Sequence, residues 1–293
     1  MKKVKFFMTA RNSNDRLSEK EPPFFSKQSN ECLPVLEIDS DVTYQTIEGF
    51  GGAFTEAGGY NLSTLSQEKR EEVIKSYFSP EVGLGYSLCR THINSCDFSL
   101  GNYAYNNVPG DTKLKKFDIS RDKKYLTPFI HDAMKVNCSN FKLIASPWSP
   151  PAWMKSNGKI NNGGKLLNKY YDVWALYIAK YIEKYNTEGI DIWEITVQNE
   201  PDATQVWESC RYSAIEERDF IKEHLKPVLV KHNLDNVKIM IWDFNRDQIY
   251  ERAKIILSDP KAASFIWGIG FHWYSGEQFK NVAKVYKIIR IKN

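Results

Sequence analysis

Short apolar runs recur along the chain, and most of them are followed by a segment with helical periodicity. The runs are rich in β-branched and aromatic residues, as buried strands are, and they cover 86–90, 141–146, 190–198, 237–242 and 265–271. Amphipathic helices are predicted between them, over 66–74, 170–185 and 216–232. Strands that alternate with helices predict βαβ units and a parallel sheet.

The first 47 residues have a different pattern. Residues 1–31 are polar and contain two consecutive prolines, so we expect a flexible N-terminal arm. Residues 33–47 alternate apolar and polar side chains, which predicts a half-buried antiparallel strand. The predicted organisation is therefore an arm over 1–31, a strand over 32–46 and an α/β domain over 47–293.

Polar and aromatic residues follow many of the predicted strands. They are Arg90, Trp148, Asn199-Glu200, Asp243 and His272-Trp273-Tyr274. Two architectures share the strand–helix alternation, the doubly wound sheet and the (β/α)8 TIM barrel. No GxGxxG follows the first strand, which weighs against a dinucleotide-binding fold. Side chains from several strand ends meet at one mouth in the barrel, so we predict the barrel.

The predicted strand over 190–198 ends at Asn199-Glu200-Pro201. A glutamate at such a strand end is held on a rigid element and faces the loops. There it can handle a proton while its asparagine neighbour binds a substrate hydroxyl. The ordinary alternative is that Glu200 caps a helix that begins after Pro201.

The composition is that of a soluble globular protein, with 42% hydrophobic and 26% charged residues. A net charge of +4, from 40 basic and 36 acidic residues, is too balanced to indicate a nucleic-acid partner. Aromatic residues reach 14% and include eight tryptophans. Tryptophan and tyrosine faces commonly bind sugar rings, although core packing explains most single rings.

Five cysteines without a CxxC pair argue against a zinc site or a disulfide framework, and favour reduced thiols in a cytoplasmic protein. The apolar stretch near the N-terminus runs only from about Val4 to Met8, against the ~7–15 residues of a secretory signal. No segment approaches the ~20 apolar residues of a membrane span. The expected location is cytoplasmic, with secretion left open.

Five segments, taken in order, resemble the motifs of one family, glycoside hydrolase family 30, of the glucosylceramidase type. Residues 45–57 resemble its first barrel strand, 90–99 its second-strand motif and 145–155 its third. Residues 196–201 are similar to its acid/base motif, and 271–274 to its sixth-strand motif. The likeness covers roughly 32–285, and five ordered motifs make a chance match very improbable.

The resemblance implies a retaining β-glycosidase on a (β/α)8 barrel with an attached β-sandwich, to which residues 33–46 would contribute. Glu200 would be the general acid/base, which needs a carboxyl whose pKa is raised by burial and by a nearby negative nucleophile. No metal and no organic cofactor is implied. The expected partner is a small-molecule, oligosaccharide or glycolipid β-glycoside, and glucosylceramide, a β-1,6-glucan and a xyloside all remain open as substrates.

The same resemblance assigns the remaining candidate residues. Those that would bind sugar or orient the nucleophile are Asn199 for the 2-hydroxyl, Asp97 and Trp148 for hydroxyls at the far side of the ring, Arg90 and Tyr274 for the nucleophile, and His272 for lining the pocket. Ordinary structural roles compete with these. They are a turn between Asp97 and Ser99, an ion pair of Arg90, packing of Trp148 under the following prolines, and a core position for His272.

The nucleophile of the family would lie at the end of a seventh strand. The chain continues for 19 residues after Tyr274, and residues 283–293 contain no carboxylate. We therefore expect a truncated or shifted reading frame near Val285, about six βα units, and unpaired sheet edges that make the fold marginal and prone to aggregate. The nucleophile is expected to be absent from this chain.

Three alternatives follow from that expectation. Asp243 and Glu277 are the candidates to replace the nucleophile, but neither lies where the seventh-strand residue would, and retaining chemistry needs two carboxyls ~5–5.5 Å apart. A catalytically inactive, sugar-binding fragment is the main competing hypothesis. A metal-dependent hydrolase is disfavoured because only His92 and His272 lie near predicted strand ends.

The glycines at 49, 51 and 52 resemble a phosphate loop at first sight. They are assigned to tight packing, since no Lys-Ser/Thr follows them.

Overall fold

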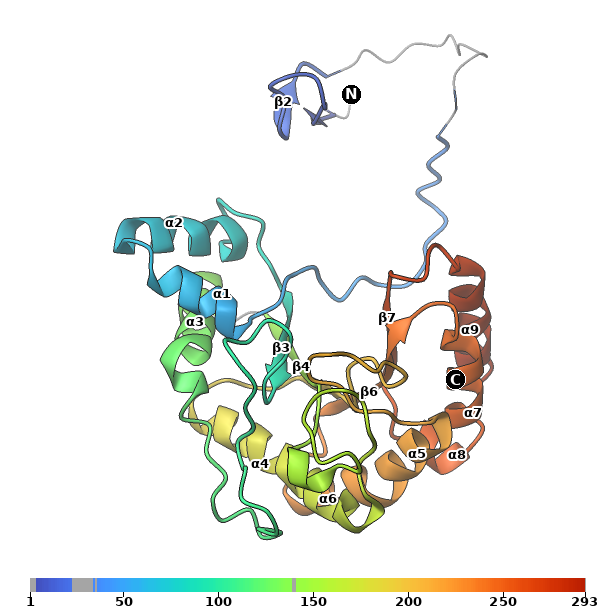
Figure 1. Cartoon of the computed structure of the whole chain (residues 1–293). Coiled ribbons are helices and arrows are strands. Elements are labelled where there is room, and N and C mark those ends of the chain that lie inside the picture. Colours follow the sequence, from blue (N-terminus) through green and yellow to red (C-terminus); the bar gives the residue numbers. More distant parts are fainter. Residues whose placement is uncertain (1–3, 23–33, 35, 139–140, 293) are drawn as a thin grey trace. The chain divides into compact units, whose positions relative to one another are not determined.

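The computed structural model describes residues 4–22, 34, 36–138 and 141–292. The chain divides into two compact units, residues 1–47 and 48–293, and each is described here by itself. Figure 1 shows the second unit with its strands at the centre and its helices around them.

The first unit contains a small antiparallel pair, β1 (Phe6–Met8) and β2 (Ser18–Lys20). The guanidinium of Arg16 donates to the carbonyl oxygens of Ala10 and Ser13 and so closes the connection between the two strands. The described part of the predicted arm is therefore a hairpin. The two prolines that suggested an unstructured arm lie after it.

The strand predicted over 33–47 is not formed in its described residues. Leu36, Ile38 and Tyr44 are more than four-fifths exposed, and residue 34 and residues 36–47 hold no strand. Alternation of apolar and polar residues requires a neighbouring strand to satisfy the backbone, and the described residues offer none here. Residues 32, 33 and 35 lie outside the described residues, and the sandwich contribution stays a prediction.

The second unit is built on a parallel sheet, as the strand–helix alternation predicts. In the described residues its strands are neighbours in sequence order: β3 (Leu88–Ile93), β4 (Lys142–Pro147), β5 (Glu194–Thr196), β6 (Lys238–Asn245) and β7 (Gly268–His272). All four pairings are parallel. A short segment before the first helix continues the sheet beyond β3, since Arg90 N–H donates to Gly52 O (3.1 Å) and Phe54 N–H to Arg90 O (2.7 Å).

The segment before the first helix lies so close to β3 that no side chain fits between the two backbones at Gly51. A Cβ on Gly51 would come within 1.8 Å of the carbonyl oxygen of Leu88. The glycine-rich stretch is therefore a close backbone contact, as the sequence predicts, and not a phosphate loop. With this segment the described sheet corresponds to six βα units of an incomplete (β/α)8 barrel.

Helices follow the strands in the expected places. They are α1 (Glu56–Ser63), α2 (Gln67–Phe78), α3 (Asp122–Asn137), α4 (Tyr171–Thr187), α5 (Ala214–Asp219), α6 (Lys226–Lys231), α7 (Ile249–Leu257), α8 (Pro260–Ala263) and α9 (Phe279–Lys292), with short 3₁₀ turns at Ala152–Met154 and Asn168–Tyr170. The helix predicted over 216–232 is interrupted by a π-helical turn, Phe220–Leu225. Pro227 has no N–H to continue an α-helical ladder there.

The hydrophobic core lies between the sheet and the helices. Alternate strand residues, such as Leu143, Ile195 and Ile239, join one buried cluster with Trp174 and Tyr181 of α4. The intervening positions of the same strands point the other way and carry many of the polar side chains. The strand period therefore separates the residues that hold the fold from those that can form a site.

Candidate active site

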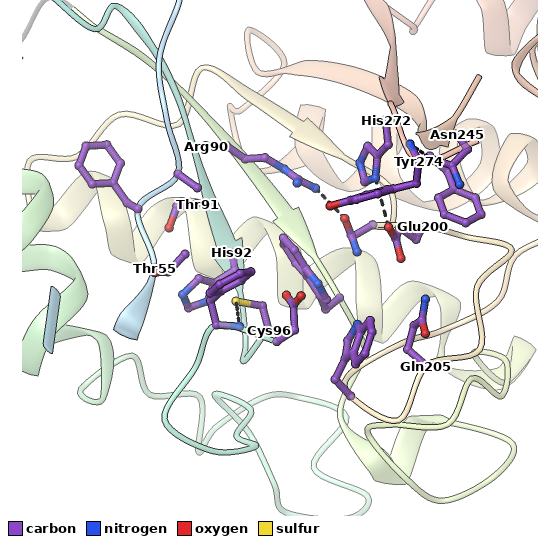
Figure 2. Close-up of a pocket in the computed structure, with 18 residues that line it drawn as sticks. Thr55, Arg90, Thr91, His92, Cys96, Glu200, Gln205, Asn245, His272 and Tyr274 are labelled. Atoms are coloured by element: carbon purple, nitrogen blue, oxygen red, sulfur yellow. Dashed lines mark hydrogen bonds and ion pairs between the residues drawn. The ribbon is translucent and has the colours of Figure 1, made fainter. Parts of the chain in front are cut away.

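A cavity of about 520 Å³ lies at the C-terminal ends of the strands. Its lining comes from the segment before α1, from β3 and its loop, from the residues that follow β4 and β5, and from the C-terminal ends of β6 and β7 (Figure 2). All seven residues that the sequence singles out line it: Arg90, Asp97, Trp148, Asn199, Glu200, His272 and Tyr274. The structure brings them together because parallel strands present their C-terminal ends on one side of the sheet.

Glu200 is fixed by its backbone on both sides. Its N–H donates to Asp243 O (3.0 Å), and the N–H of Asn199 donates to Pro147 O (2.8 Å). These bonds tie the end of β5 to β4 and β6. Glu200 itself has a left-handed backbone with φ 50°, which is uncommon for a residue with a side chain and costs of order 1–3 kcal/mol.

His272 lies between two carboxylates. Its Nδ1 is 3.2 Å from Glu200 Oε1, and its Nε2 is 2.9 Å from Asp243 Oδ1. Burial lowers the pKa of His272, but the hydrogen bonds with Asp243 and Glu200 outweigh it and raise that pKa to about 9. At neutral pH the imidazole is therefore protonated and donates one N–H to each carboxylate. In Figure 2 a dashed line joins His272 to Glu200.

Arg90 connects three strands through one guanidinium. Its Nη2 donates to Asn199 Oδ1 (2.9 Å) and Asp243 Oδ2 (2.6 Å), and its Nε donates to Ser146 Oγ (3.0 Å). The guanidinium also lies 4.7 Å from the centre of the Trp148 ring, within cation–π range. The ion pair that the sequence offered as an alternative for Arg90 is thus present, with Asp243 as its partner.

Asp243 is a buried residue that the sequence placed at a strand end and considered only as a disfavoured replacement for the nucleophile. Both of its oxygens are occupied, Oδ1 by His272 and Oδ2 by Arg90 and by the Thr196 hydroxyl (2.8 Å). Burial raises the pKa of Asp243, but the charge of Arg90 and the bond from His272 outweigh burial and hold that pKa below its usual value. Asp243 lies behind the cavity wall and is not free to attack a sugar. Glu277 does not line the cavity either.

Asp97 and Trp148 form another part of the wall. Burial raises the pKa of Asp97, and the negative charges of Glu200 and Glu208 raise it further, while hydrogen bonds from its own backbone and from Trp148 oppose this. The turn that the sequence offered as an alternative for Asp97 is present: Asp97 lies in a turn that the Ser99 N–H closes by donating to Cys96 O (2.9 Å). The Ser99 hydroxyl also accepts from the N–H of Cys96 (3.0 Å), on the other side of the same turn.

Tyr274 lies at the rim. Its side chain is 65% exposed, and its N–H donates to Asn245 Oδ1 (3.1 Å). Sequence reasoning missed Asn245, Gln205 and Trp207, which also line the cavity. The last two lie on the loop after Glu200 and have no periodic pattern that would single them out.

No ligand set for a metal is present in the described residues, where no three His, Cys, Asp or Glu side chains are grouped suitably. His92 lines the cavity but is engaged by the backbone, since its Nε2 accepts from Glu56 N–H (3.3 Å) and its Nδ1 lies 2.6 Å from Asn94 O. Every helix within the described ranges is too short or too polar to cross a bilayer.

Comparison with known proteins supplies the family. The profile described as the glycosyl hydrolase family 30 TIM-barrel domain matches residues 47–287. Putative glucosylceramidase 4 of Caenorhabditis elegans is 40% identical over 85% of this chain and 49% of its own length. Lysosomal acid glucosylceramidase of Mus musculus is 34% identical over 82% of this chain and 48% of its own length.

A solved structure agrees with these relatives. SrfJ from Salmonella typhimurium is 39% identical, with a TM-score of 0.81 over 84% of this chain and 55% of that protein. The chain thus spans about half the length of the curated relatives it matches. The family profile covers most of the chain, so this protein belongs to glycosyl hydrolase family 30.

Proposed function

We propose that this chain carries the acid/base side of a retaining β-glycosidase site, with Glu200 as the general acid/base. The observation that carries the proposal is the placement of the Glu200 carboxylate in the cavity. It is bound by His272 and shares the wall with Asn199, Asp97 and Trp148. A retaining glycosidase needs one carboxyl that protonates the leaving oxygen and then activates water.

The other residues have roles that fit their contacts. The carbonyl oxygen of the Asn199 amide accepts from Arg90, which turns the amide NH₂ away from Arg90 and leaves it for a sugar hydroxyl. The Asp97 carboxylate, which accepts a hydrogen bond from Trp148, has further acceptor capacity for hydroxyls farther along the ring. His272 holds Oε1 of Glu200 in one position, and Asp243 holds His272.

We propose a β-linked glucosyl residue as the group that enters the cavity. The relatives named glucosylceramidases favour glucose over xylose. The cavity volume of about 520 Å³ is sufficient for one sugar ring with part of its aglycone.

A second candidate function is sugar binding without turnover. Among the described residues that line the cavity, the carboxylates are Glu200 and Asp97, and Asp97 is on the sugar-binding wall. Asp243, the next carboxylate inward, has both oxygens bonded. The retaining mechanism requires a second carboxyl ~5–5.5 Å from the first, so this observation favours a binding role for the described part of the chain.

The test uses two aryl β-glucosides that differ in leaving group. With 4-methylumbelliferyl β-glucoside, Glu200→Gln should lower the rate by about 10²–10⁴, the usual contribution of general acid catalysis. With 2,4-dinitrophenyl β-glucoside the first step needs little acid assistance, so the loss in bond cleavage should be much smaller. Asp247→Asn, which changes an exposed carboxylate outside the cavity, is the control.

Binding separates the two candidates if no hydrolysis is seen. Methyl β-glucoside should change the tryptophan fluorescence of the chain through Trp148, and Trp148→Phe should reduce that change. Binding without hydrolysis would favour the sugar-binding role. Neither hydrolysis nor binding, in a folded chain, would overturn both.

A further inference from the structure

Three charged residues form a cluster outside the cavity lining, two of them buried and the third, Asp202, partly exposed. Glu217 on α5 is completely buried, and Arg252 on α7 is 6% exposed. Arg252 Nε and Nη2 both lie 3.0 Å from Glu217 Oε2, and Arg252 Nη1 lies 3.4 Å from Asp202 Oδ1. We call these three residues the brace. Asp202 follows Glu200 by two positions, so the brace touches the loop that carries the acid/base.

The brace also holds the strand behind the cavity. The second oxygen of Glu217, Oε1, accepts from the backbone N–H of Trp242 (2.9 Å), and the guanidinium of Arg252 lies 5.1 Å from the centre of the Trp242 ring. Trp242 and Asp243 have left-handed backbones, with φ 74° and 52°, at the irregularity between β6 and β7. Two consecutive residues with side chains rarely adopt this conformation, which costs of order 1–3 kcal/mol each.

That irregular backbone aims the groups of the site. It turns the Asp243 carboxylate toward Arg90 and His272, and it presents the Asp243 carbonyl oxygen to the N–H of Glu200. A continuous line of contacts therefore runs from Arg252 through Glu217 and the Trp242 amide to Asp243. Asp243 then contacts Glu200 in two ways. Its carbonyl oxygen accepts from the Glu200 N–H, and its carboxylate binds His272, which binds the Glu200 carboxylate.

A buried ion pair is a poor way to gain stability, because the desolvation of both charges offsets most of their attraction. Apolar residues of similar size would hold α5 against α7 at least as well. They would not accept a hydrogen bond from the Trp242 amide. The position of the brace at the strained backbone therefore indicates a role in geometry.

We propose that Glu217 and Arg252 are positioning residues that fix the Trp242–Asp243 backbone and, through it, the orientation of Glu200 and His272. The catalytic part of this inference rests on the proposed function of Glu200. The geometric part does not, because it concerns contacts that are present without substrate.

The protonation of His272 reports the geometry directly, whether or not the chain hydrolyses anything. The charged groups that face this imidazole are Glu200, Asp243 and Arg90. Glu217→Gln keeps the size of the side chain but presents an NH₂ to Arg252 or to the Trp242 amide. The His272 pKa, followed by NMR and assigned with His272→Asn, should fall by about one unit from about 9 toward its ordinary value of 6.5.

A double variant, Glu217→Leu with Arg252→Met, separates geometry from stability. It removes both charges together, so no buried charge is left unpaired, and we expect it to stay folded. It also removes the acceptor of the Trp242 amide, so the His272 pKa should fall as in Glu217→Gln. If the wild-type chain hydrolyses aryl glucosides, both variants should lower kcat by about tenfold and leave KM nearly unchanged.

Glu56→Gln is a matched control. Glu56 is also buried, pairs with an arginine, Arg121 (2.8 Å), and accepts a backbone N–H, from Leu100 (2.7 Å). Its loss should cost comparable stability and leave the His272 pKa in place. An unchanged His272 pKa in folded Glu217→Gln and in the double variant would overturn the positioning role. Failure of the wild type to act on or bind glucosides would overturn only the proposed function.

Discussion

At the scale of single residues, the site depends on two cationic side chains that share one buried carboxylate. Arg90 and His272 each bond to Asp243, and each also bonds to one residue of the Asn199-Glu200 pair. Every one of these contacts carries at least one charge, which makes it stronger than a neutral hydrogen bond. The orientation of Glu200 is therefore coupled to the charge of an imidazole.

This coupling predicts a pH-dependent stability. The pKa of His272 is raised from 6.5 to about 9 on folding, so its protonation stabilises the fold fully below about pH 6.5, and the contribution is lost as pH rises to about 9. The linked free energy of unfolding is about 3 kcal/mol. Urea unfolding at pH 6 and pH 9.5 should show a larger loss for the wild type than for His272→Asn.

The difference between the two proteins is the quantity that matters in this experiment. Burial lowers the pKa of Lys155 to about 8, and burial raises the pKa of Glu194 to about 8, so both titrate nearby. They are unchanged in the variant and cancel in the comparison. Identical pH dependences of the two proteins would contradict the assigned role of His272.

The sequence was sufficient to predict that seven residues share one cavity, because the strand ends are recognisable and a barrel places them on the same side of the sheet. It did not predict that Asp243 joins Arg90 to His272. That contact depends on the left-handed backbone at Trp242 and Asp243, and no glycine marks that backbone in the sequence. Asn199 and Glu200 were predicted beside a sugar, and their roles stay predictions.

At the scale of elements, the positions of the helices were predicted, but the interruption of one of them was not. The pattern over 170–185 corresponds to α4, Tyr171–Thr187, because a long stripe of buried aromatic and aliphatic residues fixes both face and length. The region 216–232 has the same kind of stripe, but it divides into α5, a π-helical turn and α6 around Pro227. The strand predicted over 33–47 was wrong in its described residues, since alternation does not supply a partner strand.

The contact between α1 and α3 gives a prediction at this scale. A Cβ on Gly59 would lie 2.2 Å from the carbonyl oxygen of Tyr125 on α3, so the two helices approach through backbone. Gly59→Ala should raise the helix propensity of α1 yet lower stability by about 1–3 kcal/mol, because α3 has to move. Thermal unfolding measures the change.

The neighbouring glycine provides the comparison. A Cβ on Gly58 would meet side-chain atoms of Thr55 and Phe129 at 3.2 and 3.4 Å, and side chains can shift. Gly58→Ala should therefore lower the melting temperature less than Gly59→Ala. Equal effects would mean that the helix contact does not limit the size of residue 59.

At the scale of the barrel unit, the last strand is exposed in a way the inner strands are not. All three residues of β5 are buried, whereas β7 is only partly covered and its Phe271 is 47% exposed. In the described residues β7 pairs with β6 alone. An open parallel edge with apolar side chains is a template for association with other chains.

This arrangement predicts self-association of the purified chain. Phe271→Lys places a charge on the edge strand and should shift sedimentation-velocity profiles toward the monomer. Val230→Lys changes a residue of similar exposure, 53% on α6, and should have little effect. A wild-type chain that sediments as a single monomer at high concentration would refute the prediction.

The contacts of Arg90 also set the order in which this unit can be completed during synthesis. The hydrogen-bond partners of its guanidinium lie 56, 109 and 153 positions later in the chain, at Ser146, Asn199 and Asp243. A growing polypeptide emerges at roughly 5–20 residues per second. For several seconds after Arg90 is synthesised its charge can only be solvated by water, and the cavity wall is complete only after Tyr274 has been translated.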